Sequence, residues 1–421
     1  MEIIKNIKME GKHFWGFAFI NLTYFSIWCI VAWYLTLWMS EVANLDSGFS
    51  GIVFSTMAAA SLIFQPFLGM ISDKLLFRKT LILTISISAI FIGPYFQWAF
   101  IPLLGINKFL VTIFTGIFLG FVLNGGSSVV EQYVQRSALA NKFEYGHARM
   151  GGSVAAMLST LIAGRLFIWQ PYAIFWAGSF FGVIMTLILI FSAKVNLENA
   201  SLVGDTSNCI EIKQVLQVFK LKNFWALSLF FMGSAAIYDV VDQQFIVFFR
   251  TFFDTTDKAT LVYSYVGSFN SILEFILMIP MPYIINKIGA KNGLILAGFV
   301  AAARTIGSAF APNWWIVILF RLLAGLEMPL ILVSITKYIA GTFDMRLYAT
   351  IYILSANFAK QISVFILSAI AGNLYDVIGF QRAYLFMGVA ILAITFITMF
   401  TLKNEKDYAD NTVILKNEYD N

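Results

Sequence analysis

A series of apolar stretches, each about twenty residues long and separated by short polar segments, constrains this chain most strongly. An α-helix rises about 1.5 Å per residue, so a stretch of that length crosses the hydrocarbon core of a bilayer. Twelve stretches fit this description: 14–39, 49–72, 80–103, 108–135, 144–168, 171–193, 223–250, 260–286, 291–311, 313–340, 348–375 and 380–402. We therefore expect an all-α membrane protein with twelve transmembrane helices.

The composition agrees with this class. Hydrophobic residues make up 59% of the 421 residues and charged residues only 12%, whereas soluble domains average roughly half apolar and about a quarter charged. The polar segment Met1–His13 precedes an apolar run that is too long for the core of a signal peptide. That run is therefore expected to be an uncleaved first span.

The polar segment from Lys194 to Lys222 contains no long apolar run and separates six stretches from six. We expect an N-terminal six-helix bundle at 1–193, a cytoplasmic middle loop at 194–222, a C-terminal six-helix bundle at 223–402 and a cytoplasmic tail at 403–421. Similar basic loops, Ser72–Lys79 and Ile285–Asn292, follow the second and the eighth stretch. This echo indicates the parallel repeats of a major facilitator fold, although any cytoplasmic hairpin attracts cations.

The loop cations orient the bundle. Most of them, including Lys74, Lys79 and Lys287, fall on one side of the predicted membrane. The opposite loops contain only Lys108, Arg250, Lys258 and Arg382, with Arg165 near a helix end. The positive-inside rule then places both termini in the cytoplasm.

The sequence contains no pattern typical of an enzyme. Cys29 and Cys209 lie in unlike surroundings, and His13 and His147 stand beside basic residues, so a metal site is not expected. We find no Walker-type phosphate loop and no serine elbow. The net charge of +5 is not concentrated in a patch, so nucleic acid is not an expected partner.

Nine ionisable residues lie within the predicted helices: Glu131, Asp239, Asp242, Glu274, Glu327, Arg149, Arg304, Arg321 and Lys360. Charges at membrane depth are costly and are retained where they find partners or line a path. Five acids and four bases leave one carboxylate without a cation, and such a group in a low-dielectric site tends to hold a proton. The chemistry of a one-proton coupling site and a set of purely structural ion pairs are both open interpretations.

The aromatic residues have several interpretations. Trp38, Trp314 and Trp315 stand near predicted helix ends and are typical of the membrane interface. Phe25 and Trp28 are in the middle of the first helix, where a ring either packs in the core or stacks on the apolar face of a sugar. The small-residue run Asn124–Ser128 either lets helices approach closely or leaves room for a polar substrate beside Glu131.

Four blocks carry a resemblance to a known family: Phe143–Met150, Tyr238–Phe245, Ile285–Asn292 and Ala371–Tyr375. The chain resembles the oligosaccharide:proton symporter family of the major facilitator superfamily, whose type member is lactose permease, from Phe14 to about Leu402. The loop Gly69–Lys79 is generic to the superfamily, and Leu76 stands where its usual pattern has glycine.

The resemblance implies proton-coupled symport, by alternating access, of a disaccharide or small oligosaccharide such as lactose, other galactosides or sucrose. It implies a multi-pass protein of a bacterial-type cytoplasmic (inner) membrane, functional as a monomer in the lipid bilayer. The proton is the coupling ion, and no other cofactor is expected. The expected partners are the sugar, the proton and the bilayer.

The resemblance also implies roles, position by position. Glu131 and Arg149 match the carboxylate and guanidinium that hold the sugar. Glu327 matches the carboxylate that carries the proton, and Arg304 matches the arginine that assists its deprotonation. Asp239 matches the partner of Lys360, and Asp242 matches the partner of Arg321, a lysine in the type member. We add these residues from the same regions: Phe25, Trp28, Ser127, Ser153 and Glu274 for sugar binding, and Tyr238 for proton coupling.

Three positions depart from lactose permease. Ala156 replaces the tryptophan that stacks on the galactopyranosyl ring, Ala324 replaces a histidine of the site, and Ser271 replaces a binding-site glutamate. Glu274, one turn later, and Trp28 resemble sucrose permease instead. The choice between a galactoside and sucrose therefore stays open.

Two other function classes stay open at this point. One is a major facilitator transporter of another small solute, a nucleoside or a drug, including an antiporter. The other is a sugar sensor that binds sugar without moving it.

Overall fold

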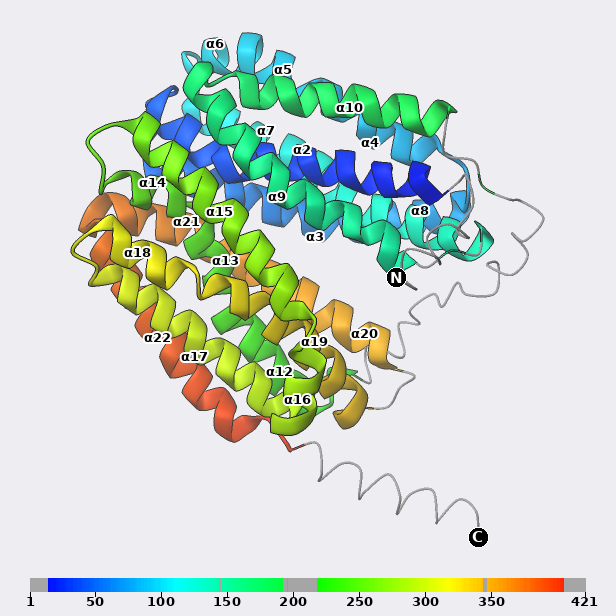
Figure 1. Ribbon diagram of the computed structural model, residues 1–421, viewed down its shortest axis with the longest axis vertical. Helices are drawn as coiled ribbons and strands as arrows, with labels where there is room; N and C mark the ends of the chain where they lie inside the picture. Colours follow the sequence, from blue (N-terminus) through cyan, green and yellow to red (C-terminus); the bar gives the residue numbers. More distant parts are fainter. Residues whose placement is uncertain are drawn as a thin grey trace. The chain divides into compact units, whose positions relative to one another are not determined.

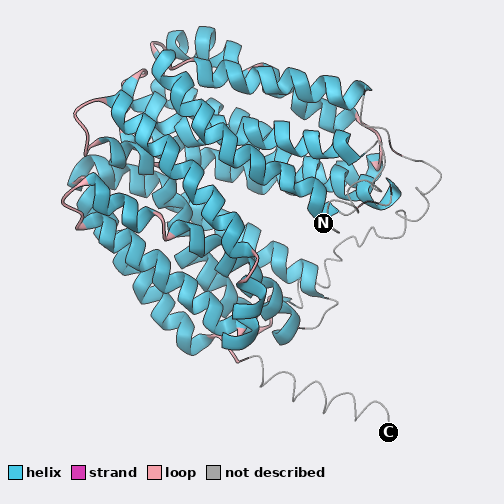
Figure 2. Cartoon of the chain, in the orientation of Figure 1, coloured by secondary structure: helices cyan, strands magenta, loops and turns pink. Residues whose placement is uncertain are grey.

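The computed structural model describes residues 14–141, 143, 145–191, 195, 218–343 and 347–404. Every regular element within these ranges is a helix (Figures 1 and 2). Twelve helical segments are long and apolar enough to cross a membrane: Phe14–Glu41, Ser47–Leu75, Thr80–Leu104, Lys108–Asn141, Tyr145–Trp169, Ala173–Phe191, Lys222–Gln243, Thr256–Met278, Ala290–Ala309, Trp314–Thr342, Thr350–Ile378 and Phe380–Thr401. The predicted all-α class and the twelve spans are confirmed. Most of the predicted middle loop and tail lies outside the described residues.

The chain divides into two compact units. The first comprises residues 1–208 and 253–268, and the second comprises 209–252 and 269–421. The predicted bundles did not anticipate that 253–268 belongs with the first unit. Ser268 donates a hydrogen bond to the Met157 carbonyl (2.8 Å), and the Tyr263 ring centroid lies 5.6 Å from that of Tyr34, which explains the grouping.

The first unit is built around the long helix α2. Its elements are α2 (Phe14–Glu41), α3 (Ser47–Leu75), α4 (Thr80–Ile90), α5 (Ile92–Pro94), η1 (Tyr95–Phe100), α6 (Ile101–Leu104), α7 (Lys108–Leu119), η2 (Gly120–Gly125), α8 (Gly126–Asn141), α9 (Tyr145–Trp169), α10 (Ala173–Phe191) and the first half of α15 (Thr256–Met278). Helix α2 packs against α9, α10 and α8 (Figure 1). It is apolar on nearly all sides because other helices surround it.

One aromatic prediction is wrong. Trp38 on α2 is completely buried, and its ring packs edge-on against Phe96, Phe100, Tyr172 and Phe175 at centroid distances of 5.0–5.4 Å. Its position near a helix end suggested the membrane interface, but α10 and the η1 segment cover it. Trp315, by contrast, is 65% exposed.

The second unit centres on α17. Its elements are α12 (Lys222–Phe230), η5 (Phe231–Ala235), α13 (Ala236–Gln243), α14 (Phe245–Arg250), the second half of α15, α16 (Met281–Ile288), α17 (Ala290–Ala309), α18 (Trp314–Arg321), α19 (Ala324–Thr342), α20 (Tyr348–Tyr352), η7 (Ile353–Ala359), α21 (Lys360–Ile378) and α22 (Phe380–Thr401). Helix α17 packs against both α19 and α22 (Figure 1).

Two predicted spans end earlier than expected. The stretch 223–250 is interrupted at Gln244, whose φ of −117° and ψ of 14° separate α13 from α14. The stretch 260–286 ends at Met278, and a separate helix begins after Pro280. Proline has no backbone N–H to continue a helix, whereas apolar composition alone runs through both breaks.

Three π-helical segments lie directly before helices that carry predicted site residues. Segment η2 precedes α8 with Glu131, η5 precedes α13 with Asp239, and η7 precedes α21 with Lys360. Such widened turns occur frequently at functional sites. In η2 the loosened carbonyls find a partner, since the Tyr24 hydroxyl donates to the carbonyls of Val122 (3.0 Å) and Leu123.

Candidate functional site

The first unit brings Glu131 of α8 and Arg149 of α9 into contact. Arg149 Nε donates to Glu131 Oε1 at 3.1 Å. The Arg149 side chain remains 37% exposed and the Glu131 side chain 41% exposed. A charged pair that is accessible to this degree still has donor and acceptor atoms available for a polar ligand.

Phe25 of α2 completes this contact. The Arg149 guanidinium carbon lies 4.1 Å from the centre of the Phe25 ring. A Cβ at Gly152 would collide with the Arg149 Nη1 atom and with the Phe25 ring. The glycine therefore leaves room for α9 to hold the guanidinium over the aromatic ring, which is a favourable cation–π arrangement.

The other predicted sugar residues are placed less closely. Trp28 lies one turn after Phe25 on α2, half-buried, with its ring edge-on to Trp33 at 6.3 Å. The Ser127 hydroxyl of α8 donates to the Asn124 carbonyl in the preceding segment η2 at 2.8 Å, and Ser153 is exposed. Glu274 is half-buried in the part of α15 that belongs to the second unit.

In the second unit, Arg304 of α17 lies between two carboxylates. Its Nε donates to Glu327 Oε1 at 3.0 Å, and its Nη1 donates to Asp242 Oδ1 at 2.6 Å. Arg304 is 2% exposed and Glu327 is fully buried. This site is therefore closed to solvent, unlike the pair in the first unit.

Asp242 has a second cationic partner. Arg321, the last residue of α18, donates to the same Oδ1 atom at 2.5 Å. Aromatic rings cover both guanidinium groups, with Tyr238 4.6 Å from Arg304 and Phe245 4.5 Å from Arg321. Four helices, α13, α17, α18 and α19, thus meet at one charged cluster.

A separate ion pair joins α13 to α21. Lys360 Nζ lies 2.8 Å from Asp239 Oδ2, and the two side chains are 26% and 31% exposed. The structure therefore forms both of the pairs that the resemblance implied, Asp239 with Lys360 and Asp242 with Arg321.

The contact between Arg304 and Asp242 could not be predicted from the sequence. The two residues are 62 positions apart on different helices, and counting acids against bases suggested one-to-one pairs. In the structure, Asp242 and Glu327 share Arg304, while Asp242 also pairs with Arg321.

One oxygen of the buried carboxyl has no assigned bond. Within the described residues, Glu327 Oε2 and Arg304 Nη2 have no hydrogen-bond partner. Glu327 is also in the first turn of α19, where aligned peptide dipoles stabilise negative charge. The arrangement can thus stabilise the ionised form of Glu327 through the bond at Oε1. In the neutral form, Oε2 is the oxygen that is free of a hydrogen bond in the described part of the chain and can hold the proton.

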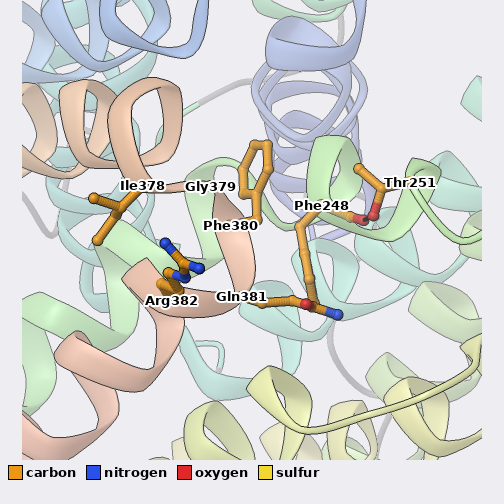
Figure 3. A pocket seen from close by; sticks show the side chains of 7 residues that line it. All are labelled: Phe248, Thr251, Ile378, Gly379, Phe380, Gln381 and Arg382. Atoms are coloured by element: carbon orange, nitrogen blue, oxygen red, sulfur yellow. Dashed lines mark hydrogen bonds between the residues drawn. The ribbon is translucent and has the colours of Figure 1, made fainter.

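A surface pocket of about 490 Å³ lies elsewhere in the second unit, where α14 ends and α21 meets α22 (Figure 3). Its lining residues are Phe248, Thr251, Ile378, Gly379, Phe380, Gln381 and Arg382. None of the predicted site residues lines it. Among the described residues, no group of three or more His, Cys, Asp or Glu is arranged to hold a metal ion.

Known structures share this fold. The crystal structure of the nucleoside transporter NupG superimposes with a TM-score of 0.79, covering 93% of this chain and 100% of that one. Its sequence identity is only 13%, so the likeness concerns the fold alone.

Sequence relatives are more informative. The chain is 39% identical to the raffinose permease of Escherichia coli over 94% of both proteins. It is also 39% identical to the melibiose permease of Enterobacter cloacae subsp. cloacae over 95% of both. The family model described as LacY proton/sugar symporter matches residues 6–414, nearly the whole chain. The chain belongs to the LacY proton/sugar symporter family.

Proposed function

We propose that this proton/sugar symporter takes up an oligosaccharide of the raffinose or melibiose type together with one proton. One observation carries the proposal: the chain holds two charged sites of opposite character. The pair Glu131–Arg149 is open to a polar ligand, whereas the pair Arg304–Glu327 is closed to solvent. Sugar binding and proton binding thereby have separate residues.

The open pair suits a sugar. A guanidinium donates two parallel hydrogen bonds and a carboxylate accepts two, which matches neighbouring hydroxyls on a pyranose ring. Phe25 holds the guanidinium from behind, and Trp28 on the same helix offers an aromatic face. We assign Ser127 and Ser153 supporting polar roles beside this pair, and we keep Glu274, which belongs to the second unit, as a proposed sugar-binding residue.

The closed pair suits the proton. Because Glu327 is fully buried, a proton bound to its carboxyl stays out of contact with bulk solvent until the protein changes state and opens a path for it to leave. We assign Glu327 the proton, Arg304 the role of favouring the ionised form, and Tyr238 the role of covering Arg304.

The substrate class follows from the relatives and from two small residues. The relatives at 39% identity are named for raffinose and melibiose. Ala156 and Ala324 stand where lactose permease has a tryptophan and a histidine, which removes two bulky side chains and favours a larger or differently shaped sugar. We place the protein in a bacterial cytoplasmic membrane with both termini cytoplasmic, and propose that it functions as a monomer without a resident cofactor.

Replacing Glu327 with alanine tests this assignment. Cells that express Glu327→Ala should exchange labelled raffinose or melibiose across the membrane but fail to accumulate either sugar uphill. The matched control is Asp254→Ala, which removes an exposed loop carboxylate and should leave accumulation intact. Uphill accumulation by Glu327→Ala would contradict the assignment, and counterflow of lactose or sucrose in preference to both other sugars would contradict the substrate class.

A further inference from the structure

Arg304 is shared between two acids, and this sharing has a consequence for proton binding. Glu327, Asp242, Arg304 and Arg321 comprise two carboxylates and two guanidinium groups in direct contact. Their formal charges cancel when Glu327 is ionised. A proton on Glu327 leaves the cluster with one excess positive charge.

That excess positive charge has to be stabilised at a buried site from which solvent is excluded. A guanidinium does not lose its proton in a protein, and Arg304 is only 2% exposed. A buried charge left without its partner is strongly destabilising. When Glu327 becomes neutral, Arg304 therefore needs another anion within hydrogen-bond distance.

We propose that Asp242 is that anion: it is the counter-ion of Arg304 while Glu327 carries the proton. Asp242 Oδ1 lies 2.6 Å from Arg304 Nη1, and Asp242 is the other carboxylate that forms an ion pair with Arg304 in the described part of the chain. Asp242 is then a positioning residue of the proton site and not only a tie between α13 and α18. This inference rests on the proposed role of Glu327.

Arg321 adjusts the strength of this counter-ion. Arg321 donates to the same Oδ1 atom at 2.5 Å, so the negative charge of Asp242 is shared between two arginines and stabilises Arg304 less. Removing Arg321 should leave Asp242 entirely to Arg304 and favour the proton on Glu327. Removing Asp242 should have the opposite effect.

Three tyrosines also lie near the cluster, and a phenol is ordinarily uncharged at neutral pH. They are Tyr238 on α13, Tyr375 on α21 and Tyr384 on α22. The Tyr238 ring contacts Arg304, and the Tyr384 hydroxyl donates to the Val241 carbonyl at 3.2 Å. None of them supplies the negative charge that Arg304 requires.

The pair Asp239–Lys360 is a built-in control. Its acid, Asp239, stands three residues before Asp242 on the same helix, α13. Asp239 and Lys360 form a single ion pair at 2.8 Å, and their side chains are more exposed than those of Asp242 and Arg321. Neutralising both of its members removes two charges that compensate each other. Neutralising both Asp242 and Arg321 also conserves net charge, yet it takes away the second acid of Arg304.

Infrared titration of the purified protein, without any sugar, measures how each variant changes the pH at which Glu327 is protonated. The protonated-carboxyl band that Glu327→Gln abolishes is followed against pH in each variant. Asp242→Asn should move the midpoint of this band about two pH units lower, and Arg321→Gln should move it higher. The double variant Asp242→Asn/Arg321→Gln should stay at least about one unit below the wild type, whereas Asp239→Asn/Lys360→Gln should match the wild type.

A wild-type midpoint in the Asp242/Arg321 double variant would overturn the inference, as would shifts of the same sign in the two single variants. If Asp242→Asn alone does not fold, the double variant and Arg321→Gln still decide. If Glu327→Gln removes no band in the wild-type background, the proposed proton site itself is wrong, which is a different failure.

Discussion

Leu76, in the loop after α3, adopts a backbone conformation that suits glycine. Its φ is 49° and its ψ is −100°. A side chain with a Cβ is strained at positive φ, at a cost on the order of 1–3 kcal/mol. The generic superfamily loop has glycine at this position, so the sequence flagged the departure but not the strain.

Replacing Leu76 with glycine should stabilise the folded protein by about 1 kcal/mol, because relief of the strain exceeds the extra entropy of the unfolded glycine. Thermal unfolding of purified protein in detergent measures the change. Leu76→Ala is the control, since it shortens the side chain but keeps the Cβ. A midpoint temperature for Leu76→Gly at or below that of Leu76→Ala would contradict the strain.

We expect sugar binding to depend on the planar shape of the Arg149 guanidinium and not only on its charge. Lysine keeps the charge but loses the planar donor pair and the contact of the guanidinium with the Phe25 ring. Arg149→Lys should weaken sugar binding by about 30- to 100-fold, the equivalent of roughly 2–3 kcal/mol for a lost charged hydrogen bond. Equilibrium binding of labelled melibiose or raffinose provides the measurement.

Arg165 supplies the matched control for that substitution. It is on the same helix, α9, but is exposed, and its guanidinium donates to the Tyr265 hydroxyl at 3.4 Å. Arg165→Lys should bind sugar as the wild type does. Equal affinity of both lysine variants would show that the geometry of Arg149 is not used.

At the scale of elements, α2 and α9 approach each other through a glycine. A Cβ on Gly151 would lie 2.5 Å from the backbone oxygen of Ala18. Backbone atoms do not move aside as flexible side chains do, so the two helices would have to separate. The same helix contains Gly146, where an added Cβ meets no atom within 4 Å.

Gly151→Ala should therefore lower the stability of the protein by about 1–3 kcal/mol through overpacking. Gly146→Ala should be neutral or slightly stabilising, because alanine is a better helix former than glycine. Thermal unfolding, followed by a thiol-reactive dye or by tryptophan fluorescence, compares the stabilities of the two variants. A larger loss for Gly146→Ala than for Gly151→Ala would refute the close approach.

Helix positions were largely predictable, but their interruptions were not. Apolar length and composition located all twelve spans, since crossing a bilayer requires about twenty such residues. The break at Gln244 and the π-helical segments have no compositional signature and depend on contacts such as those of Tyr24 with η2. Trp38 was placed wrongly because α10 and η1, distant in sequence, cover it.

The charged residues show the same limit. The prediction that Glu131, Arg149, Arg304 and Glu327 bind the sugar or the proton rests on their cost in a membrane and on the resemblance. Which partner each one takes depends on helix packing, so the sharing of Arg304 between Glu327 and Asp242 emerged only from the structure.

At the scale of the whole molecule, each compact unit carries one of the two charged sites. The first contains Glu131 and Arg149, and the second contains Arg304 and Glu327. Family membership makes the chain a proton/sugar symporter. We propose in addition that the sugar and the proton bind at these separate places and that Glu327 carries the proton.

Proton movement with sugar tests this account most directly. Raffinose or melibiose is added to de-energised, lightly buffered cells that express the protein, and the external pH is recorded alongside entry of labelled sugar. We expect the wild type to alkalinise the medium as sugar enters, whereas Glu327→Gln should not change the pH. Sugar entry into wild-type cells without alkalinisation, or the same alkalinisation with Glu327→Gln, would contradict it.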